Sequence, residues 1–197
     1  MEPKIKASTL SKIAFITWLV LASTPGWSLD LDTVLENTAV TPPASVGFRE
    51  VRHNPLFKAP MVLTGYLEYI EAGQLRKVIE TPFEEAFLID KDHIEVERNG
   101  KIQKIPLNKS KFLKSMLGGI EAILAGREEQ LASAFSYELT GTSSSWSLRL
   151  KPLSRSASRH LKNLLVTGNE NSVTSIRFDL REGEWHLMEI ISADSKP

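Results

Sequence analysis

Apolar and polar residues alternate along three short runs between positions 63 and 89. The runs are separated by Ala72-Gly73 and Thr81-Pro82, and such pairs are typical of turns between strands. A period of two predicts β-strands whose side chains point alternately to opposite faces of a sheet. The segment is therefore expected to form an antiparallel meander with one apolar face. The apolar side chains expected on that face are Leu63, Leu67, Tyr69, Ile79, Phe87 and Ile89.

Shorter runs of the same kind recur on both sides of this meander. Two of them flank Asn99-Gly100, and Asn-Gly is among the strongest short signals for a two-residue hairpin turn. The total is about ten antiparallel strands, and a sheet of that size usually curls into a barrel or half-barrel that hides its edges. The predicted fold class is mostly β, of the α+β type. The additional strands are expected at 46–51, 92–97, 101–107, 135–139, 146–150, 164–167, 173–180 and 184–191.

Two segments show the spacing of an amphipathic helix. Residues 30–39 form a short one with acidic residues near its start, and residues 110–126 form a longer one. In the longer helix, Ser110 is suited to cap the start and Gly126 to end it. The basic, serine-rich segment 154–162 is either a short helix or a loop. The apolar positions of the longer helix are Phe112, Met116, Ile120, Ile123 and Leu124.

Gly118 and Gly119 lie in the middle of the longer helix. Each costs about 1 kcal/mol relative to alanine in a helix interior, so the pair needs a reason. One reason is close packing on the sheet, and the other is a hinge in a mobile cover. Glycines inside helices most often serve close contact, which favours packing.

Residues 1–28 have the composition of an export signal. Three lysines precede an apolar run at 13–22 that is too short to span a bilayer comfortably, and a proline-glycine pair follows it. Cleavage is expected before Leu29, which leaves one domain, residues 29–197, in the periplasm. An uncleaved membrane anchor is the alternative interpretation of the same run.

The charges of the chain are nearly balanced. The sequence has 24 basic and 24 acidic residues, and removal of three lysines and one glutamate with the signal leaves 21 and 23. This balance argues against a nucleic-acid partner, which requires a basic surface. The absence of cysteine excludes a disulfide, a thiolate metal site and the lipid attachment of a lipoprotein. The domain therefore folds by its core alone.

The densest group of titratable residues consists of Asp90, Asp92, His93 and Glu95. Carboxylate and imidazole groups of this kind could hold a metal ion. However, strand alternation places His93 and Glu95 on the same side, opposite the apolar residues of the strand, as on an ordinary solvated face. We therefore predict no metal site here.

Glu84 and Glu85 could serve as paired carboxylates in acid-base chemistry. They lie beside Pro82 at a turn, where solvation is the expected fate of both. The sequence also contains no nucleophile elbow, no H-E-x-x-H motif and no glycine-rich phosphate loop. We predict no catalytic residues and no cofactor, and we expect that the protein is not an enzyme.

A series of short motifs follows along the mature chain. They are Gly65-x-Leu67-x-Tyr69, Leu75, Thr81-Pro82, Leu88-Ile89-Asp90, the helix from Phe112 to Leu124, Ala125-Gly126 and Trp146-x-Leu148-x-Leu150-x-Pro152. From about Leu35 to Ile191, this order resembles the LolA family of periplasmic lipoprotein carriers, most closely its LolA-related branch. The resemblance implies an eleven-stranded, half-open barrel whose concave apolar face is covered by a helical lid. It also implies a cavity for acyl chains, and no enzymatic activity.

The resemblance also implies partners. The expected cargo is a lipoprotein or another acylated lipid, and the expected membrane partners are an inner-membrane transporter and an outer-membrane acceptor. We expect a monomer that carries its cargo toward the outer membrane, as a chaperone for acyl chains. The sheet residues expected to line the cavity are Leu63, Leu67, Tyr69, Ile79, Phe87, Ile89, Phe135, Tyr137, Trp146 and Leu148. The helix residues expected to face them are Phe112, Met116, Ile120 and Leu124.

One position departs from the family pattern. In the main carriers, an arginine in the turn after the Gly-x-Leu strand holds the lid shut, whereas this sequence has Glu71 near that place. The nearest arginine, Arg76, falls in the following strand. The departure brings the lid latch and the docking to the usual transporter and acceptor into question. The departure also suggests that the cargo is an acylated molecule other than a lipoprotein, such as a glycolipid or a polyene-type lipid.

Two other classes of function are compatible with the same residues. The inward side chains could form the ordinary packed core of a non-enzymatic structural or assembly factor at the outer membrane, which functions through its surface, because the same alternation serves both arrangements. A packed core cannot take up a fluorescent fatty acid, so uptake separates the two. A hydrolase of envelope lipids is the third class, and its site would be the cluster around His93.

Overall fold

The computed structural model describes residues 29–191, except for the side chains of Lys111, Phe112 and Ser115. The predicted export signal, residues 1–28, lies outside the described residues. Within the described part of the chain, no helix is long and apolar enough to cross a bilayer.

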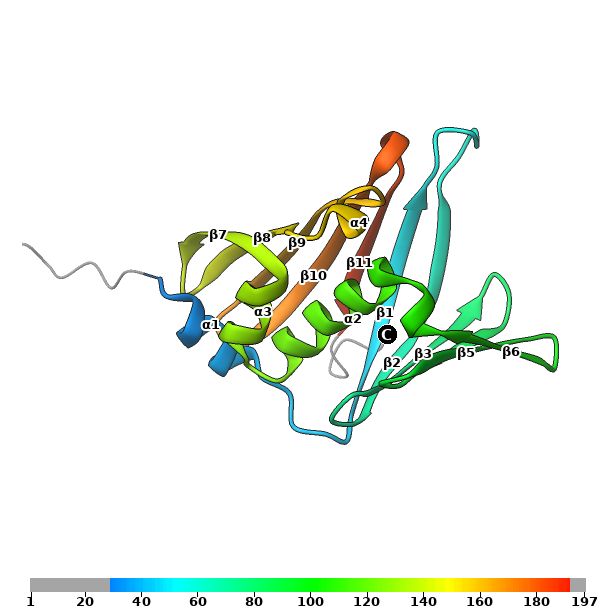
Figure 1. The fold of residues 1–197 in the computed structure, drawn as a ribbon, viewed down its shortest axis with the longest axis horizontal. Helices are drawn as coiled ribbons and strands as arrows, with labels where there is room; N and C mark the ends of the chain where they lie inside the picture. Colours follow the sequence, from blue (N-terminus) through cyan, green and yellow to red (C-terminus); the bar gives the residue numbers. More distant parts are fainter. Residues whose placement is uncertain (1–28, 192–197) are drawn as a thin grey trace, which may run out of the picture.

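A single antiparallel sheet of eleven strands forms the framework (Figure 1). Its order is β6-β5-β4-β3-β2-β1-β11-β10-β9-β8-β7, so β6 and β7 are the two edges and the sheet does not close. The predicted half-open barrel is thereby confirmed. The strands are β1 (Ala44–His53), β2 (Met61–Glu71), β3 (Gln74–Thr81), β4 (Glu85–Ile89), β5 (His93–Arg98), β6 (Lys101–Pro106), β7 (Phe135–Thr142), β8 (Ser145–Pro152), β9 (Leu161–Asn169), β10 (Ser172–Leu180) and β11 (Trp185–Ile191).

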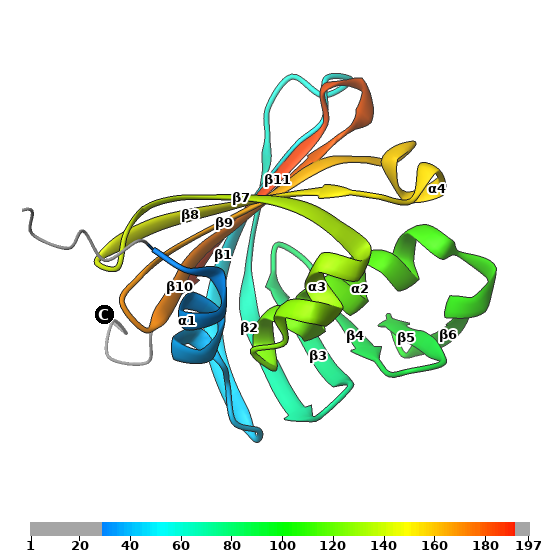
Figure 2. The same cartoon turned by 60° about the vertical axis from the view of Figure 1, so that its left-hand side comes forward.

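The register confirms the alternation expected for the meander. Leu63 lies opposite Glu50 of β1, and Leu67 lies opposite Val46, so these side chains share one face of the sheet. The same face continues to β4, where Phe87 pairs with Lys77 of β3. We call it the concave face, because the sheet curves around the helices that lie on it (Figure 2).

Within residues 29–191, four α-helices lie among the strands: α1 (Leu31–Thr38), α2 (Lys111–Leu124), α3 (Glu128–Ala134) and α4 (Arg155–Ser158). The long helix α2 begins and ends as predicted. The Ser110 hydroxyl accepts a hydrogen bond from the Leu113 N–H at 3.2 Å, and Gly126 has a φ of +65°. Helix α3 was not expected, because Arg127 at its start provides no side-chain cap that would mark it in the sequence.

The predicted hairpin between β5 and β6 is present. Asn99 and Gly100 both have positive φ angles, 53° and 71°, which is the conformation that a two-residue turn of this type requires. Two short 3₁₀ helices connect the other described elements. Leu107–Lys109 leads into α2, and Arg181–Gly183 joins β10 to β11.

Candidate functional site

Three apolar clusters cover the concave face, and helices pack on two of them. The first lies under α1, α2 and α3, with Leu35, Ala122 and Leu131 packed over the strands β8 and β9. At the other end, Leu117, Leu113 and Met116 of α2 pack near Ile94 of β5. The third, which we call the central cluster, consists of Phe48, Leu63, Ile79 and Met188, all of them buried.

The central cluster differs from the other two in what covers it. Leu67, Phe83, Phe87 and Ile190 pack against it, and all of them belong to strands or to the β3–β4 turn. Among the side chains that the structure describes, no helix residue belongs to this cluster. Among the described hydrophobic side chains, the central cluster is therefore formed by the sheet and the β3–β4 turn, while α2 contributes to the clusters on both sides of it.

The residues predicted to line a cavity are distributed over all three clusters. Leu63 and Ile79 belong to the central cluster, and Leu67 and Phe87 pack against it. Ile89 and Met116 join the cluster around Ile94, whereas Phe135, Trp146 and Leu148 join the one under the three helices. Tyr69 is buried, and Ile120 and Leu124 of α2 are half-buried. Lipid binding by these residues stays a prediction.

Two of the predicted residues need separate mention. The Phe112 side chain lies outside the described part of the structure. Tyr137 is 44 % exposed, on the edge strand β7, and its hydroxyl donates a hydrogen bond to Glu128 of α3 at 3.1 Å. The register places Tyr137 opposite Leu150, so it belongs to the concave face but stands at its rim.

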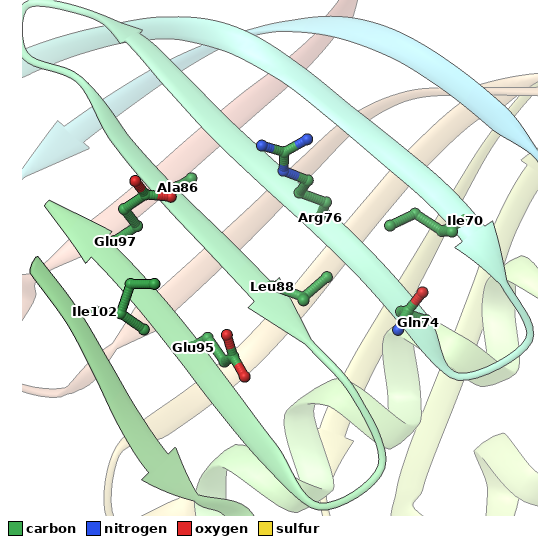
Figure 3. Close-up of a pocket in the computed structure, with 8 residues that line it drawn as sticks. All are labelled: Ile70, Gln74, Arg76, Ala86, Leu88, Glu95, Glu97 and Ile102. Atoms are coloured by element: carbon green, nitrogen blue, oxygen red, sulfur yellow. The ribbon is translucent and has the colours of Figure 1, made fainter. Parts of the chain in front are cut away.

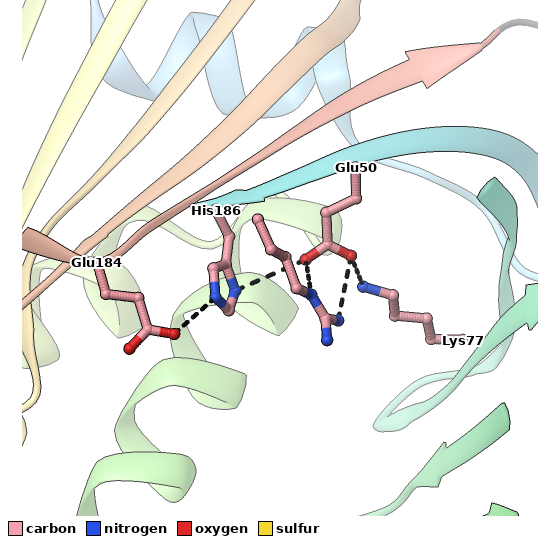
Figure 4. A network of polar contacts seen from close by, with 5 residues as sticks. Glu50, Lys77, Glu184 and His186 are labelled. Carbon is pink, nitrogen blue, oxygen red and sulfur yellow. Dashed lines mark hydrogen bonds and ion pairs between the residues drawn. The ribbon is translucent and has the colours of Figure 1, made fainter. Parts of the chain in front are cut away.

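A network of charged side chains, missed in the sequence, borders the central cluster (Figure 4). Glu50 is only 3 % exposed and accepts hydrogen bonds from the guanidinium of Arg52 and from the ammonium of Lys77. His186 Nδ1 lies 3.6 Å from the same carboxylate, and its Nε2 lies 3.1 Å from Glu184. The network joins β1, β3 and β11 across the middle of the sheet.

Lys77 reaches this network by an unusual path. Its ammonium nitrogen lies 4.7 Å from the centre of the Phe48 ring, so the side chain crosses the central cluster before it meets Glu50. Gly65 lies on the intervening strand and has no side chain in the way. The signal in the sequence is a charged residue at an inward position of an alternating strand, as in Val46, Phe48, Glu50.

Burial and neighbouring charges shift the pKa values of Glu50, Lys77 and His186 in this network. Burial alone would raise the pKa of Glu50, but its hydrogen bond with Arg52 and the charges of Lys77 and Arg52 outweigh burial and hold the pKa below 4.5. Burial lowers the pKa of Lys77 below 10.5, although Glu50 opposes the shift. Burial also lowers the pKa of His186 below 6.5, against the hydrogen bond with Glu184. Glu50 is therefore ionised at neutral pH.

The opposite, convex face of β2–β6 has a shallow hollow of about 300 Å³ (Figure 3). None of the residues predicted to line a cavity contributes to it. Alternation explains this on β2 and β4, because Ile70, Ala86 and Leu88 are the outward neighbours of predicted residues. The residues that line the hollow are Ile70, Gln74, Arg76, Ala86, Leu88, Glu95, Glu97 and Ile102.

The acidic cluster around His93 is internally paired. His93 Nδ1 lies 3.0 Å from Asp90, its Nε2 lies 2.9 Å from Glu95, and Lys104 also contacts Glu95. Burial alone would raise the pKa of Asp90, but hydrogen bonds from the backbone N–H groups of Asp92 and His93 lower it. Among the described residues, no group of histidine and acidic side chains is arranged to hold a metal ion.

The expectation that Glu84 and Glu85 are both solvated was wrong for one of them. Glu84 is exposed, but Glu85 is buried on the concave face, where its carboxylate forms an ion pair with Arg98 at 2.6 Å. The cross-strand register accounts for the difference, because Glu85 lies directly opposite Arg98 of β5.

Glu71, at the position of the expected lid latch, is exposed at the end of β2. The nearest arginine, Arg76, points to the convex face and contacts Glu68 at 3.4 Å. Arg76 therefore belongs to the face opposite the helices and does not take the place of the latch.

Comparisons with solved structures give similar folds at low identity. A LolA superfamily protein from Nitrosomonas europaea is 14 % identical, over 83 % of this chain and 92 % of that chain, with a TM-score of 0.45. A DUF1329 family protein from Desulfovibrio piger is 10 % identical, over 85 % and 92 %, with a TM-score of 0.47. The lipoprotein LppX from Mycobacterium tuberculosis is 9 % identical, over 81 % and 92 %, with a TM-score of 0.40.

Comparison with curated protein sequences gave no match. Residues 22–191 match the family model of "Outer membrane lipoprotein carrier protein LolA-like". This range includes every strand of the sheet and all four helices. The chain therefore belongs to the LolA-like family of outer-membrane lipoprotein carrier proteins.

Proposed function

We propose that this protein is a non-enzymatic periplasmic carrier that holds the acyl chains of a lipoprotein or another acylated lipid against the central cluster. One observation carries the proposal: among the described hydrophobic side chains, the central cluster is formed by the sheet and the β3–β4 turn, while α2 contributes to the clusters on both sides of it. Movement of α2 away from the sheet would uncover apolar side chains on both sides of the central cluster.

The energetics of an acyl chain suit such a surface. Each methylene group that leaves water contributes about 0.8 kcal/mol, so a chain must stay shielded throughout its transit. A single helix that packs on the flanks of the surface can be displaced without disruption of the sheet. The family to which the chain belongs supports a carrier role, and the further path toward the outer membrane is part of the proposal.

Uptake of a fluorescent fatty acid tests the carrier role. Leu67 and Tyr66 are neighbours on β2 and are both half-buried, but Leu67 faces the central cluster and Tyr66 faces the convex side. We expect wild-type protein to take up the probe, Leu67→Asp to lose uptake, and Tyr66→Asp to keep it. Circular dichroism and urea unfolding establish that both variants are folded.

A second variant distinguishes a loss of uptake from a loss of folding. Leu67→Trp adds bulk beside the central cluster without adding a charge, so it should reduce uptake while the protein stays folded. Failure of the wild-type protein to bind the probe, or equal uptake by all variants, would overturn the carrier role in favour of a packed core.

The identity of the cargo requires a separate measurement. Exposed Glu71 leaves the lid without the expected arginine latch, which favours an acylated lipid other than a lipoprotein. Mass spectrometry of the protein purified from its own periplasm would identify the bound molecules. Recovery of lipopeptides would contradict the different cargo but not the carrier role.

A further inference from the structure

The loop between β1 and β2 carries the two most exposed large apolar side chains among the described residues. Leu56 is 88 % exposed, and its neighbour Phe57 is 67 % exposed. We call residues 54–60 the apical loop. Scattered single apolar residues are normal at a protein surface, but two adjacent and largely exposed ones at a loop tip mark a contact surface.

The apical loop holds these side chains in a defined turn. The side-chain oxygen Oδ1 of Asn54 accepts a hydrogen bond from the Leu56 N–H at 2.9 Å, and the Asn54 carbonyl accepts one from the Phe57 N–H at 3.0 Å. Pro55 also lies beside the β10–β11 turn, where a Cβ placed on Gly183 would be 3.2 Å from its ring. Exposure of Leu56 and Phe57 is therefore built into the turn.

The position of the loop restricts what can cover it. The tip projects from one end of the sheet, beside the β10–β11 turn and away from α1 and α3, in both views (Figures 1 and 2). A projecting pair of side chains cannot receive another chain as a groove does, but it can enter a soft, apolar layer. Residues 54–60 also include Lys58 and no acidic residue, which suits an anionic surface.

We propose that the apical loop is a membrane-contact site, which inserts Leu56 and Phe57 into the interfacial layer of a lipid bilayer while Lys58 meets lipid phosphate groups. Two side chains give only weak and reversible binding, which suits a protein that leaves the surface again. Arg52 and Glu184, at the same end of β1 and β11, bring the charged network of the concave face close to that surface.

Vesicle binding tests this proposal with the full mature chain. The probe is a vesicle of phosphatidylethanolamine and phosphatidylglycerol, used at about millimolar lipid because binding is weak. We expect the wild-type protein to float with the vesicles and Leu56→Ser/Phe57→Ser to lose about tenfold or more in apparent affinity. Ile102→Ser removes a comparably exposed apolar side chain, 61 % exposed, from the edge strand β6 and should bind like the wild type.

The depth of insertion gives a second, independent readout. In Phe57→Trp, the introduced indole should move its emission to shorter wavelength on vesicles, and lipids with brominated acyl chains should quench it. Replacement of the anionic lipid by phosphatidylcholine should weaken binding, and Lys58→Gln should remove most of that difference.

Three results would overturn the membrane-contact site: no flotation of the wild-type protein, equal binding by the Leu56→Ser/Phe57→Ser protein, or no quenching of the introduced indole. If the loop residues mediate binding only through a receptor protein, and the protein does not bind protein-free vesicles, the membrane-contact site is overturned as well. Uptake of free fatty acid in solution should be unchanged in all loop variants, so a failure here is distinguishable from a failure of the carrier role.

Discussion

Gly119 of α2 packs directly on the ring of Phe135, the first residue of β7, so that a Cβ at this glycine would lie 2.5 Å from the ring atom Cε2. Phe135 is fully buried and cannot swing away. By contrast, a Cβ at the preceding Gly118 would meet no atom within 4 Å among the described residues. The two central glycines of the helix therefore have different roles, and the close-packing interpretation holds for the second of them.

Alanine at these two positions should change stability in opposite directions. We expect Gly119→Ala to lower the free energy of unfolding by about 1–3 kcal/mol, because the ring and the helix must separate. Gly118→Ala should raise it by up to about 1 kcal/mol, since alanine restricts the unfolded chain and meets no obstacle. Urea unfolding of both variants measures the difference, and equal effects would contradict the contact.

The close approach of β2 and β3 predicts a second pair of effects. A Cβ at Gly65 would lie 1.9 Å from the carbonyl oxygen of Val78, whereas one at Gly47 would lie 3.5 Å from its nearest neighbours. We expect Gly65→Ala to cost about 2 kcal/mol or more, because backbone atoms must move. Gly47→Ala, on the adjacent strand, should stay within about 0.5 kcal/mol of the wild type. Thermal unfolding of the two variants provides the comparison.

Removal of the charge of Glu50 should be strongly destabilising. Glu50→Gln leaves Arg52 and Lys77 without their buried counterion, which costs about 3 kcal/mol or more. The matched control is Glu189→Gln, which breaks an exposed pair with Arg49 at 2.9 Å and should cost less than about 1 kcal/mol. A small loss in Glu50→Gln, comparable to the control, would mean that the network is solvated in solution.

Because of the same network, we expect the free energy of unfolding to decrease as the pH falls below neutral. The folded-state pKa of His186 lies below 6.5, so the unfolded chain binds the proton more readily and stability falls as the pH drops from 6.5 toward the folded-state value. Glu50 adds a second loss below pH 4.5, because its folded-state pKa is also lowered. The charged groups that face His186 are Glu184, Arg52 and Glu50.

His186→Gln isolates the first of these losses. Between about pH 7 and pH 5, the wild-type protein should lose more stability than the variant, because glutamine does not titrate. Denaturant unfolding at a series of pH values measures both curves, in which the other histidines contribute equally. Parallel curves for the two proteins would show that His186 titrates as it does in the unfolded chain.

Local patterns were sufficient to predict most of the framework. The alternation of the meander, the Asn99-Gly100 turn and the Ser110 and Gly126 ends of α2 all depend on residues near one another in sequence, and each was confirmed. Helix α3 was missed because it is seven residues long and lacks a side-chain cap. The alternation predicted about ten strands and the family resemblance eleven, which agrees with the eleven in the sheet.

The charged network could not be predicted in the same way. His186 lies opposite Arg52 only because β11 pairs with β1, and nothing in the local sequence of either strand specifies that neighbour. The burial of Glu85 likewise depends on its position opposite Arg98. The convex hollow is lined by residues of five strands, β2 to β6, and a local pattern of side chains does not specify how five strands are placed side by side.

The pairing of β1 with β11 also bears on how the molecule is made. Every other neighbouring pair in the sheet consists of consecutive strands, so nine of the ten seams can close soon after their strands have been synthesised. The seam between residues 44–53 and 185–191 must wait for almost the entire polypeptide. Two half-sheets would thus coexist beforehand with exposed edges, and a chaperone that shields these edges would raise the yield of assembled protein.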